Sequence, residues 1–579
     1  MKKPWLAHYE DGVPTTIDYP AITLPQMFDE SVEKYARQSA LRMVLRYLPA
    51  GRTVGAELSY AQVKDQVDRL ATALYELGVR KGDRVAVQLP NSPHSLIAFF
   101  GVLKLGAIVV NTNPIYTARE MQHQFADSGA ETLIILNNFY PKLEKIRSDT
   151  SIKRVIVCHI NDFSGFPYNL LIKRTQQKSG DWVDVAEGSG VFHFKSLMAN
   201  YPATPPSIEI DPEDIALFQY TGGTTGVPKA AMLSHRNLIA NVVQCSNWIT
   251  DLEPGIEVIM GAIPFFHVFG MTVAMALSVY VGGKLLVMPN PRLTEMLMDQ
   301  IQREGVTLFP GVPAMYIAII NHPNVAQYNL RSVKACISGA APLPMEVQEQ
   351  FGEITGGRLV EGYGLTEAAP VTHCNPLYGQ RKPGSIGVPF PDVEARVVSL
   401  EPDAGGNFPD VSQGEEGELA LRAPQVMMGY YQRSDETAAT IDEQGWLYTG
   451  DIVRMDEQGY FYVVDRKKDL IIAGGYNIVP REVEEVLFMH AAVQEAVVVG
   501  LPHATRGETV KAYVVLKEGK TVTDEELILF CRENLAPYKV PRMIEFRSEL
   551  PKSMVGKFLR RVLVEEEKQR MASGQVDSG

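Results

Sequence analysis

Short apolar runs alternate with longer stretches of helical periodicity from about residue 20 to residue 440. One example is the apolar run at 84–89, which is followed by a helical pattern from Ser92 to Leu105 and by a second apolar run at 107–110. Strands that alternate with helices in this way are typical of parallel sheets covered by helices. The sequence therefore predicts an α/β fold for most of the chain.

The last part of the chain predicts a different architecture. The stretch from Gly384 to Arg422 holds short strand-like runs broken by Gly and Pro, which indicates a small β-rich subdomain. Beyond Arg466 the predicted elements are a helix at 482–489, strands at 495–499 and 510–517, and a second helix at 524–534. This pattern predicts a small α+β domain for the last region of the chain.

We place the domain boundary after Arg466. A large N-terminal domain, 1–466, is then expected to hold two parallel α/β sheets and the β-rich subdomain, and a small C-terminal domain spans 467–579. Residues 161–200 interrupt the βα pattern with aromatic and basic side chains followed by a polar run, so we interpret them as an insertion. Two interpretations of this insertion stay open: contact with a membrane surface, or a surface loop that packs its own apolar residues.

Composition excludes several classes of function. With 55 Lys and Arg against 68 Asp and Glu in 579 residues, the formal net charge is −13, which argues against nucleic acid as a partner. The longest apolar stretches, such as 271–281, are too short for the roughly 20 residues that span a bilayer. No apolar core follows the basic start Met1-Lys2-Lys3, so a signal peptide is disfavoured and membrane contact is expected to be peripheral.

Cysteine usage indicates a reducing cytoplasm. The five cysteines form neither a CxxC pair nor a His/Cys cluster at zinc spacing. They are Cys158, Cys245, Cys336, Cys374 and Cys531.

A glycine-rich segment gives the strongest local sign of chemistry. It reads Tyr220-Thr-Gly-Gly-Thr-Thr-Gly-Val-Pro-Lys229, follows a strand-like run at 215–219, and precedes a helix that Ser234 is expected to cap. Backbone N–H groups and threonine hydroxyls in such a loop can cradle a polyphosphate, and Lys229 adds a positive charge. It is not a Walker A loop, because Val and Pro separate the last glycine from the lysine. An ordinary glycine-rich turn is the alternative.

Three further segments, taken together, have side chains that could bind a nucleotide. Glu361-Gly-Tyr-Gly-Leu-Thr-Glu367 offers a ring for adenine, a hydroxyl for a phosphate and a carboxylate for Mg²⁺. Asp451 ends Gly445-Trp-Leu-Tyr-Thr-Gly-Asp451 and can accept hydrogen bonds from ribose hydroxyls, and Lys557 ends a loop near the C-terminus. Each segment alone also fits an ordinary turn.

In this order, the segments resemble those of the AMP-forming acyl-CoA synthetases in the adenylate-forming superfamily. The resemblance covers nearly the whole chain and extends to Pro264-Phe-Phe-His267, Ser338-Gly-Ala-Ala-Pro342, Gly384-Ser-Ile-Gly-Val-Pro389 and Gly474-Gly-Tyr-Asn-Ile478. The chain is most similar to bacterial long-chain fatty acid CoA ligases, through Lys3-Pro-Trp-Leu, Val110-Asn-Thr-Asn-Pro-Ile-Tyr116, Val464-Asp-Arg-Lys-Lys-Asp469 and Tyr538-Lys-Val-Pro541.

The resemblance implies ATP-dependent activation of a long-chain fatty acid to acyl-AMP, release of pyrophosphate, and transfer of the acyl group to coenzyme A. Mg²⁺ is the implied cofactor, and ATP and coenzyme A are the implied co-substrates. The implied location is the cytoplasm, with association at the inner face of the membrane, and relatives are commonly homodimers.

Individual residues also receive roles from the resemblance. Those expected to enclose the phosphates are Thr221, Gly222, Gly223, Thr224, Thr225, Gly226 and Lys229. Those expected around adenine are Gly339, Ala340, Ala341 and Tyr363, with Glu361, Gly362 and Gly364 beside the nucleotide. Asp451 and Arg466 are expected to hold the ribose.

The implied catalytic residues are Thr366, Glu367 and Lys557. Thr366 would reach the α-phosphate, Glu367 together with Thr221 would bind Mg²⁺, and Lys557 would bridge the carboxylate and phosphate oxygens. Lys468 is the implied hinge of a mobile C-terminal domain, whose rotation would bring Gly474, Gly475 and Tyr476 to the coenzyme A channel. His267 would border the acyl pocket.

Several alternatives stay open at this point. The chain could be an acyl-AMP ligase that delivers to a carrier protein, or a CoA ligase for medium-chain or aryl acids. A luciferase-like oxygenase is disfavoured because Ile472 stands where a lysine is expected. A non-catalytic protein that binds a fatty-acyl group or a nucleotide is disfavoured by the intact motifs.

Overall fold

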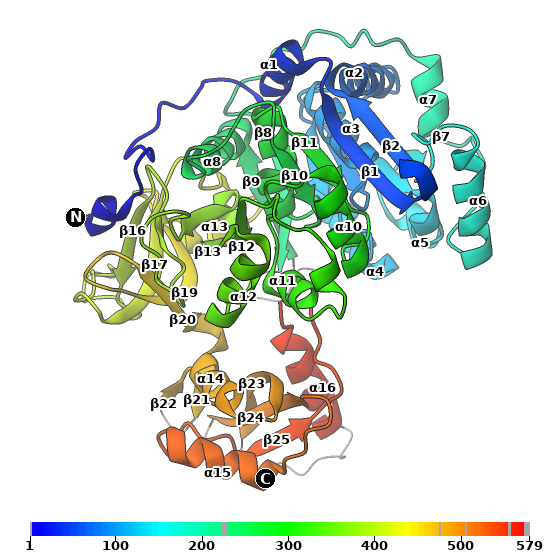
Figure 1. The fold of residues 1–579 in the computed structure, drawn as a ribbon. Coiled ribbons are helices and arrows are strands. Elements are labelled where there is room, and N and C mark those ends of the chain that lie inside the picture. The colour runs from blue at the N-terminus through cyan, green and yellow to red at the C-terminus, as the bar shows by residue number, and fades with distance from the viewer. Residues whose placement is uncertain (1–2, 223–227, 474–475, 504–506, 554–556, 573–579) are drawn as a thin grey trace. The chain divides into compact units, whose positions relative to one another are not determined.

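The computed structural model describes residues 3–222, 228–473, 476–503, 507–553 and 557–572, and the chain divides into two compact units (Figure 1). The larger unit holds Trp5–Glu394 and Arg422–Leu447. The smaller unit holds Met1–Pro4, Ala395–Leu421 and Tyr448–Gly579. The boundary predicted after Arg466 lies inside the smaller unit and stays a prediction.

An eight-stranded sheet organises the larger unit. In sheet order its strands are β18 (Gly429–Tyr430), β9 (Pro228–Ser234), β8 (Ile215–Gly222), β4 (Ile108–Asn111), β3 (Arg84–Gln88), β5 (Thr132–Leu136), β6 (Arg154–Cys158) and β7 (Val191–His193). From β8 to β7 every neighbouring pair is parallel, whereas β8, β9 and β18 pair antiparallel. The parallel strands β3, β4 and β5 are buried almost throughout, which explains their unbroken apolar sequences.

Two four-stranded sheets complete the β-structure of the larger unit. The first has the order β10 (Val258–Gly261), β11 (Lys284–Val287), β1 (Ser39–Tyr47) and β2 (Thr53–Ser59). The second has the order β12 (Ala335–Ser338), β13 (Arg358–Gly364), β14 (Val371–Cys374) and β15 (Val388–Pro389). Leu308 forms parallel bridges with both Ile259 and Ala335, and so links β10 of one sheet to β12 of the other.

Helices cover these sheets. They are α1 (Leu24–Tyr35), α2 (Tyr60–Glu76), α3 (Pro93–Leu103), α4 (Ala118–Ser128), α5 (Tyr140–Glu144), α6 (Tyr168–Ser179), α7 (Phe194–Asn200), α8 (His235–Trp248), α9 (Leu277–Tyr280), α10 (Thr294–Glu304), α11 (Pro313–Ile320), α12 (Met345–Thr355) and α13 (Ser434–Thr440). Helix α3 is buried along its whole length because it contacts β1 of one sheet and β3 and β4 of another. A helix that is apolar on all sides needs such a position between two layers.

The predicted α/β fold class is confirmed. The predicted strand–helix–strand unit at 84–110 forms as β3, α3 and β4, and α8 begins after Ser234, whose hydroxyl accepts a hydrogen bond from the N–H of Asn237 at 3.1 Å. The segment interpreted as an insertion, 161–200, contains α6 and then β7 and α7. Its strand β7 pairs parallel with β6, so the last part of the segment continues the main sheet.

The smaller unit combines two sheets with three helices. One sheet has the order β16 (Glu394–Val398), β17 (Glu416–Arg422), β19 (Leu447–Met455) and β20 (Phe461–Arg466). The other has the order β22 (Tyr476–Ile478), β21 (Ile471–Ala473), β24 (Gly507–Leu516) and β23 (Val493–His503), with β25 (Met543–Phe546) parallel to β24. The helices are α14 (Pro480–Met489), α15 (Asp524–Asn534) and α16 (Arg560–Ala572). The small α+β C-terminal domain that the sequence predicts is therefore present.

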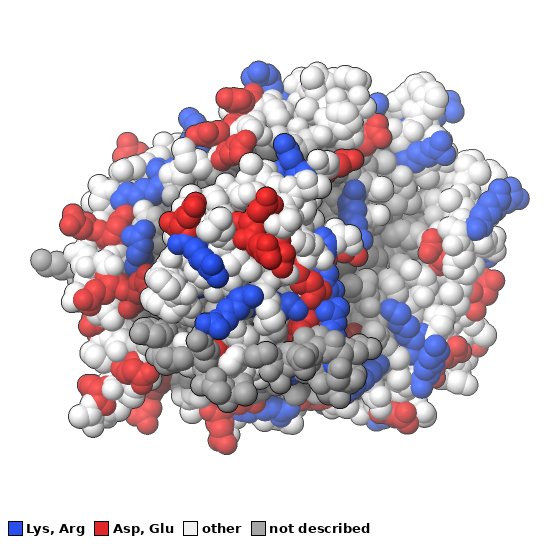
Figure 2. All heavy atoms as spheres, turned by 90° about the horizontal axis from the view of Figure 1, so that it is seen from below, with Lys and Arg blue, Asp and Glu red and all other residues white. Residues whose placement is uncertain are grey.

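The structure also shows how the charged side chains, the apolar helices and the cysteines are distributed. Acidic and basic side chains are interspersed on the face shown in Figure 2, so that face carries no continuous basic surface. None of the helices in the described part of the chain is long and apolar enough to cross a membrane. All five cysteines are buried free thiols.

The hydroxyl of Tyr60, at the start of α2, makes buried hydrogen bonds to α9 and to the segment that joins α9 to β11. It lies 2.8 Å from the carbonyl oxygen of Gly283 and 3.0 Å from that of Ser278, and all three groups are buried. We predict that Tyr60→Phe lowers the free energy of unfolding by about 1–2 kcal/mol, because it removes two buried hydrogen bonds; the Ser278 carbonyl keeps the N–H of Gly283 as a donor, whereas the Gly283 carbonyl loses the tyrosine hydroxyl. Urea unfolding of the purified variant measures this change.

Tyr280→Phe is the matched control for Tyr60→Phe. The Tyr280 side chain is half-buried, and its hydroxyl makes no hydrogen bond within the described part of the chain. Its removal is expected to change the free energy of unfolding by less than about 0.5 kcal/mol. An equal effect of both variants would contradict the role given to the Tyr60 hydroxyl.

Candidate active site

The predicted phosphate loop joins two antiparallel strands of the main sheet. Strands β8 and β9 pair with Thr221 opposite Lys229 and Gly222 opposite Pro228, so these four residues mark the base of the loop. Residues 223–227, which include the predicted Gly223, Thr224, Thr225 and Gly226, lie outside the described residues. The hairpin therefore fixes Thr221 and Lys229 side by side at the end of the sheet.

Lys229 is held by an acidic and an aromatic side chain. It is only 8% exposed, its ammonium forms an ion pair with Glu436 on α13, and it lies 5.1 Å from the ring centroid of Tyr430 on β18. A buried ammonium needs such partners, because removing a charge from water costs several kcal/mol unless it is paired. The positive charge predicted at this position is thus oriented by the fold.

Glu367 contacts the hydroxyl of the same tyrosine, Tyr430. It lies in the 3₁₀ helix η7 (Thr366–Ala368), and its carboxylate accepts a hydrogen bond from the hydroxyl of Tyr430 at 2.8 Å. Burial and the nearby Glu367 carboxylate raise the pKa of Tyr430, which keeps the phenol protonated as a donor. The structure thereby brings together Lys229 and Glu367, which lie far apart in the sequence.

A second polar group lies beside the base of the loop. Asp127 at the end of α4 accepts a hydrogen bond from the Tyr220 hydroxyl at 2.8 Å and one from Arg433 at 2.8 Å. Sequence reasoning missed Asp127, Tyr430, Arg433 and Glu436. No local pattern marks these four residues, because the contacts that place them at this site join segments between about 60 and 300 positions apart.

The residues expected around adenine follow two neighbouring parallel strands. Ser338 at the end of β12 is paired with Glu361 on β13, so Gly339, Ala340 and Ala341 leave the sheet beside Gly362, Tyr363 and Gly364. Ala340 has a φ of 68°, and the N–H of Gly339 donates to the carbonyl of Gly311 at 3.2 Å. The ends of parallel strands at a sheet edge are where open α/β sheets usually bind ligands.

Glu361 and Tyr363 both contact neighbouring residues of the protein at this edge of the sheet. The Glu361 carboxylate is 6% exposed and accepts a hydrogen bond from the N–H of Leu343 at 3.2 Å, which ties down the turn after Ala341. The Tyr363 ring packs edge-on against His373 of β14, with 5.9 Å between ring centroids. Burial lowers the pKa of His373 to about 3, so this ring is neutral. Tyr363 is half-buried, which leaves part of its ring accessible.

His267 lies in a loop fixed against β8. Its Nδ1 accepts a hydrogen bond from the N–H of Phe269 at 3.3 Å, and the carbonyl of the preceding Phe266 accepts one from Gln219 at 3.1 Å. A buried π-helix, η5 (Gly270–Ala276), follows directly. A cavity of about 10 Å³ lies between this region and the main sheet, lined in part by Phe265, Phe266 and Met275. Apolar side chains thus adjoin the loop that carries His267.

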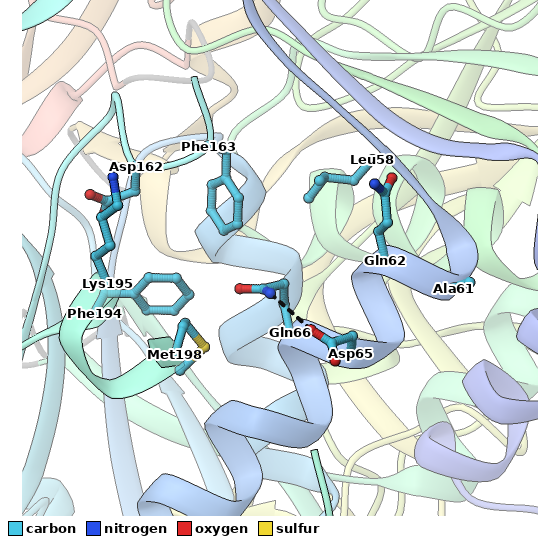
Figure 3. Close-up of a pocket in the computed structure, with 10 residues that line it drawn as sticks. All are labelled: Leu58, Ala61, Gln62, Asp65, Gln66, Asp162, Phe163, Phe194, Lys195 and Met198. Carbon is cyan, nitrogen blue, oxygen red and sulfur yellow. Dashed lines mark hydrogen bonds between the residues drawn. The ribbon is translucent and has the colours of Figure 1, made fainter. Parts of the chain in front are cut away.

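A much larger cavity lies away from these residues. It has a volume of about 540 Å³ and lies between α2, α7 and the loop after β6 (Figure 3). Figure 3 shows the rings of Phe163 and Phe194 and the Met198 side chain facing this space. None of the predicted site residues lines it.

In the smaller unit the two residues expected at ribose are direct neighbours. Asp451 on β19 and Arg466 on β20 are cross-strand partners, and the Arg466 Nε lies 2.9 Å from the Asp451 carboxylate. Asp451 is only 4% exposed, so the arginine orients a buried carboxylate. The two predicted residues therefore lie side by side on neighbouring strands.

Lys557 is exposed and lies close to Ser553. Its N–H donates to the Ser553 hydroxyl at 3.1 Å, and the N–H of Ser553 donates to the Lys557 carbonyl at 2.8 Å. The predicted hinge residue Lys468 belongs to the 3₁₀ helix η8 (Lys467–Asp469), and the backbone of Tyr476 belongs to β22. Gly474 and Gly475 lie outside the described residues.

The described residues contain no cluster of three or more His, Cys, Asp or Glu side chains that could hold a metal ion. Mg²⁺ does not require one, since it commonly uses one or two carboxylates together with substrate phosphates and water. Glu367, oriented by Tyr430 close to Lys229, fits a metal bound in that way.

Known proteins resemble the chain over its whole length. Residues 28–431 match the family model "AMP-binding enzyme", and residues 482–557 match "AMP-binding enzyme C-terminal domain". A long-chain-fatty-acid–CoA ligase of Bacillus subtilis is 44% identical over 98% of each chain. One of Escherichia coli O157:H7 is 40% identical over 100% of each.

Solved structures agree with these sequence matches. The crystal structure of ATP-bound MatB from Rhodopseudomonas palustris has a TM-score of 0.80 and 26% identity, covering 94% of this chain and 99% of that one. With a family model that matches most of the chain and full-length relatives at 40% identity or more, this protein belongs to the family of AMP-binding enzymes.

Proposed function

We propose that this protein is a long-chain-fatty-acid–CoA ligase that forms an acyl-AMP intermediate. The observation that carries the proposal is the identity of 40–44% with long-chain-fatty-acid–CoA ligases along the full length of the chain. Its substrates are a long-chain fatty acid, ATP and coenzyme A.

The chemistry explains why an adenylate is made first. A free carboxylate is a poor acyl donor because oxide is a poor leaving group. Attack of the carboxylate oxygen on the α-phosphorus of ATP forms a mixed anhydride and expels pyrophosphate. The coenzyme A thiol then attacks the acyl carbon and expels AMP. The first step places extra negative charge on the phosphate oxygens. Catalysis therefore requires cations and hydrogen-bond donors positioned around these oxygens.

In this proposal the larger unit supplies the phosphate and adenine contacts. Lys229 and Thr221 lie at the base of the loop that encloses the phosphates, and Thr366 reaches the α-phosphate. Glu367 and Thr221 hold Mg²⁺, which neutralises phosphate charge when bound. The support for Glu367 is its fixed orientation, since one of its carboxylate oxygens accepts the hydrogen bond from Tyr430.

The smaller unit supplies the ribose contact and the catalytic lysine. Asp451, oriented by Arg466, accepts hydrogen bonds from ribose hydroxyls, and Lys557 stabilises the oxygens of the reacting carboxylate and α-phosphate. Rotation about Lys468 after pyrophosphate release brings residues 474–476 toward coenzyme A. Because the coenzyme A thiol is partly ionised near neutral pH, the second step needs no cysteine of this chain.

The direct test measures AMP and acyl-CoA together. The purified protein is incubated with ATP, Mg²⁺, coenzyme A and an acid series from acetate to oleate plus benzoate. We expect equimolar AMP and acyl-CoA with a maximum at long chains. Accumulation of acyl-AMP without acyl-CoA would instead indicate an acyl-AMP ligase, and a maximum at medium-chain or aryl acids would exclude the long-chain assignment.

Lys557→Ala separates the two half-reactions. We predict that it slows acyl-AMP formation from acid and ATP by at least about 100-fold, because one charge that stabilises the transition state is lost. Transfer to coenzyme A from supplied acyl-AMP should stay within about threefold of the wild-type rate. Rapid-quench measurement of each half-reaction checks this, and an equal loss in both would contradict the role of Lys557.

We also propose that helix α6 contacts the membrane that holds the fatty acid. Phe166 is 81% exposed, and Leu170 and Leu171 are 47% and 49% exposed, whereas Ile172 anchors the helix inward. Lys173, Arg174 and Lys178 follow on the same short helix, where they suit anionic lipid head groups. The enzyme would accordingly work in the cytoplasm at the inner membrane face. The homodimer implied by the resemblance stays a prediction.

Vesicle flotation tests this contact. We predict that Phe166→Ser combined with Leu170→Gln and Leu171→Gln reduces binding to vesicles of phosphatidylcholine and phosphatidylglycerol by at least about tenfold, since three apolar side chains no longer enter the lipid. The control is Ile256→Gln with Leu293→Gln, which removes two exposed apolar side chains outside α6. Flotation that is equal in all three proteins, or absent from the wild type, would rule the contact out.

A further inference from the structure

A cluster of ionised side chains in the smaller unit is centred on Arg560. This residue begins α16 and follows the loop residue Lys557 by three positions. One guanidinium nitrogen donates to both carboxylate oxygens of Glu484, at 2.7 and 2.8 Å. A second donates to the carboxylate of Asp469 at 3.2 Å. The arginine therefore joins two acidic residues that come from different elements.

Each acidic partner belongs to a different part of the unit. Glu484 lies on α14, is 7% exposed, and also accepts a hydrogen bond from the N–H of Val498 on β23 at 2.8 Å. Asp469 is the last residue of η8, the short helix that contains Lys468. Arg560 is thus a direct connection from the start of α16 to η8 and to the core of the C-terminal α+β region.

A third carboxylate faces the same cation. Asp465 on β20 is 5% exposed and accepts a hydrogen bond from the N–H of Arg481 at 2.9 Å. Burial raises the pKa of Asp465 and of Glu484. Although burial opposes it, the negative charges of Glu484, Asp465 and Asp469 raise the pKa of Arg560. The arginine therefore compensates negative charge at Asp465 and Glu484, together with the backbone N–H groups that donate to these carboxylates.

The chain between Lys557 and Arg560 is short and constrained. The N–H of Lys557 donates to the Ser553 hydroxyl, the N–H of Ser553 donates to the Lys557 carbonyl, and the N–H of Leu559 donates to the carbonyl of Pro551 at 2.9 Å. Only Phe558 and Leu559 separate the lysine from the arginine. A displacement of the Arg560 side chain from its partners would therefore shift the loop that carries Lys557.

We infer that Arg560 is a positioning residue for Lys557, which it holds in a fixed relation to the hinge helix η8. The inference rests on the roles proposed above for Lys557 and Lys468. It adds that the contacts of Arg560 link the segment that carries Lys557 to the hinge helix η8.

The planar fork of arginine explains why this residue type suits the position. A guanidinium can donate to Glu484 and Asp469 at the same time from fixed directions, whereas a lysine ammonium supplies the charge without that geometry. Arg561, the next residue, makes a matched control. Its side chain is 65% exposed, and it pairs with Glu565 one helical turn away at 2.7 Å.

The experiment measures both half-reactions in the full-length enzyme. We expect Arg560→Gln to slow acyl-AMP formation from palmitate and ATP by at least about tenfold, with transfer from supplied palmitoyl-AMP to coenzyme A within about threefold of wild type. Arg560→Lys should recover part of the loss. Arg561→Gln should behave as wild type in both assays.

A double-mutant cycle distinguishes positioning from general damage. If Arg560 acts through Lys557, then Arg560→Gln causes no further loss of acyl-AMP formation in the Lys557→Ala background, measured by single turnover at high enzyme concentration. Losses that multiply in the double variant, or equal losses in both half-reactions of the single variant, would overturn the inference.

If Arg560→Gln does not fold, a milder variant can be used to test the same inference. Asp469→Asn keeps the Arg560–Glu484 pair and weakens only the link to η8. It should reproduce the selective slowing of acyl-AMP formation at smaller size, and wild-type behaviour in both half-reactions would overturn the inference. If the wild-type enzyme itself forms neither acyl-AMP nor acyl-CoA, the proposed function fails instead.

Discussion

Burial of α3 between two sheets is the constraint on which the larger unit depends. All eleven residues of this helix are buried, because it packs against α2 and contacts β1 of one sheet and β3 and β4 of another. A helix with no exposed face fixes the separation and orientation of both sheets. The loops at their edges, including the base of the β8–β9 hairpin and the turns after β12 and β13, are therefore presented from a rigid frame.

Polar side chains on that frame are organised around Tyr430. One aromatic residue contacts the Lys229 ammonium through its ring and the Glu367 carboxylate through its hydroxyl. Tyr430 thus holds a cation, which Glu436 also pairs, and an anion in fixed positions on neighbouring elements. Preorganised charges of this kind stabilise a charged transition state without reorganising during the reaction.

Local patterns predicted much of the fold but few of the long-range contacts. The strand–helix–strand unit at 84–110 and the cap at Ser234 follow from periodicity and hydrogen-bonding capacity, which are encoded within a few residues. Thr221, Lys229 and Glu367 were predicted because they stand inside recognisable motifs. Asp127, Tyr430 and Glu436 were missed, since each stands in ordinary local sequence and gains its role only when the sheet brings distant segments together.

The smaller unit combines an apolar core with a buried cluster of ionised side chains around Arg560. A buried ion pair contributes little net stability, because the cost of desolvation offsets the attraction, yet it penalises misalignment strongly. The contacts of Arg560 with Glu484 and Asp469 are therefore better understood as a geometric constraint than as a source of stability. Directional contacts of this kind define one arrangement of the start of α16, helix α14 and the short helix η8.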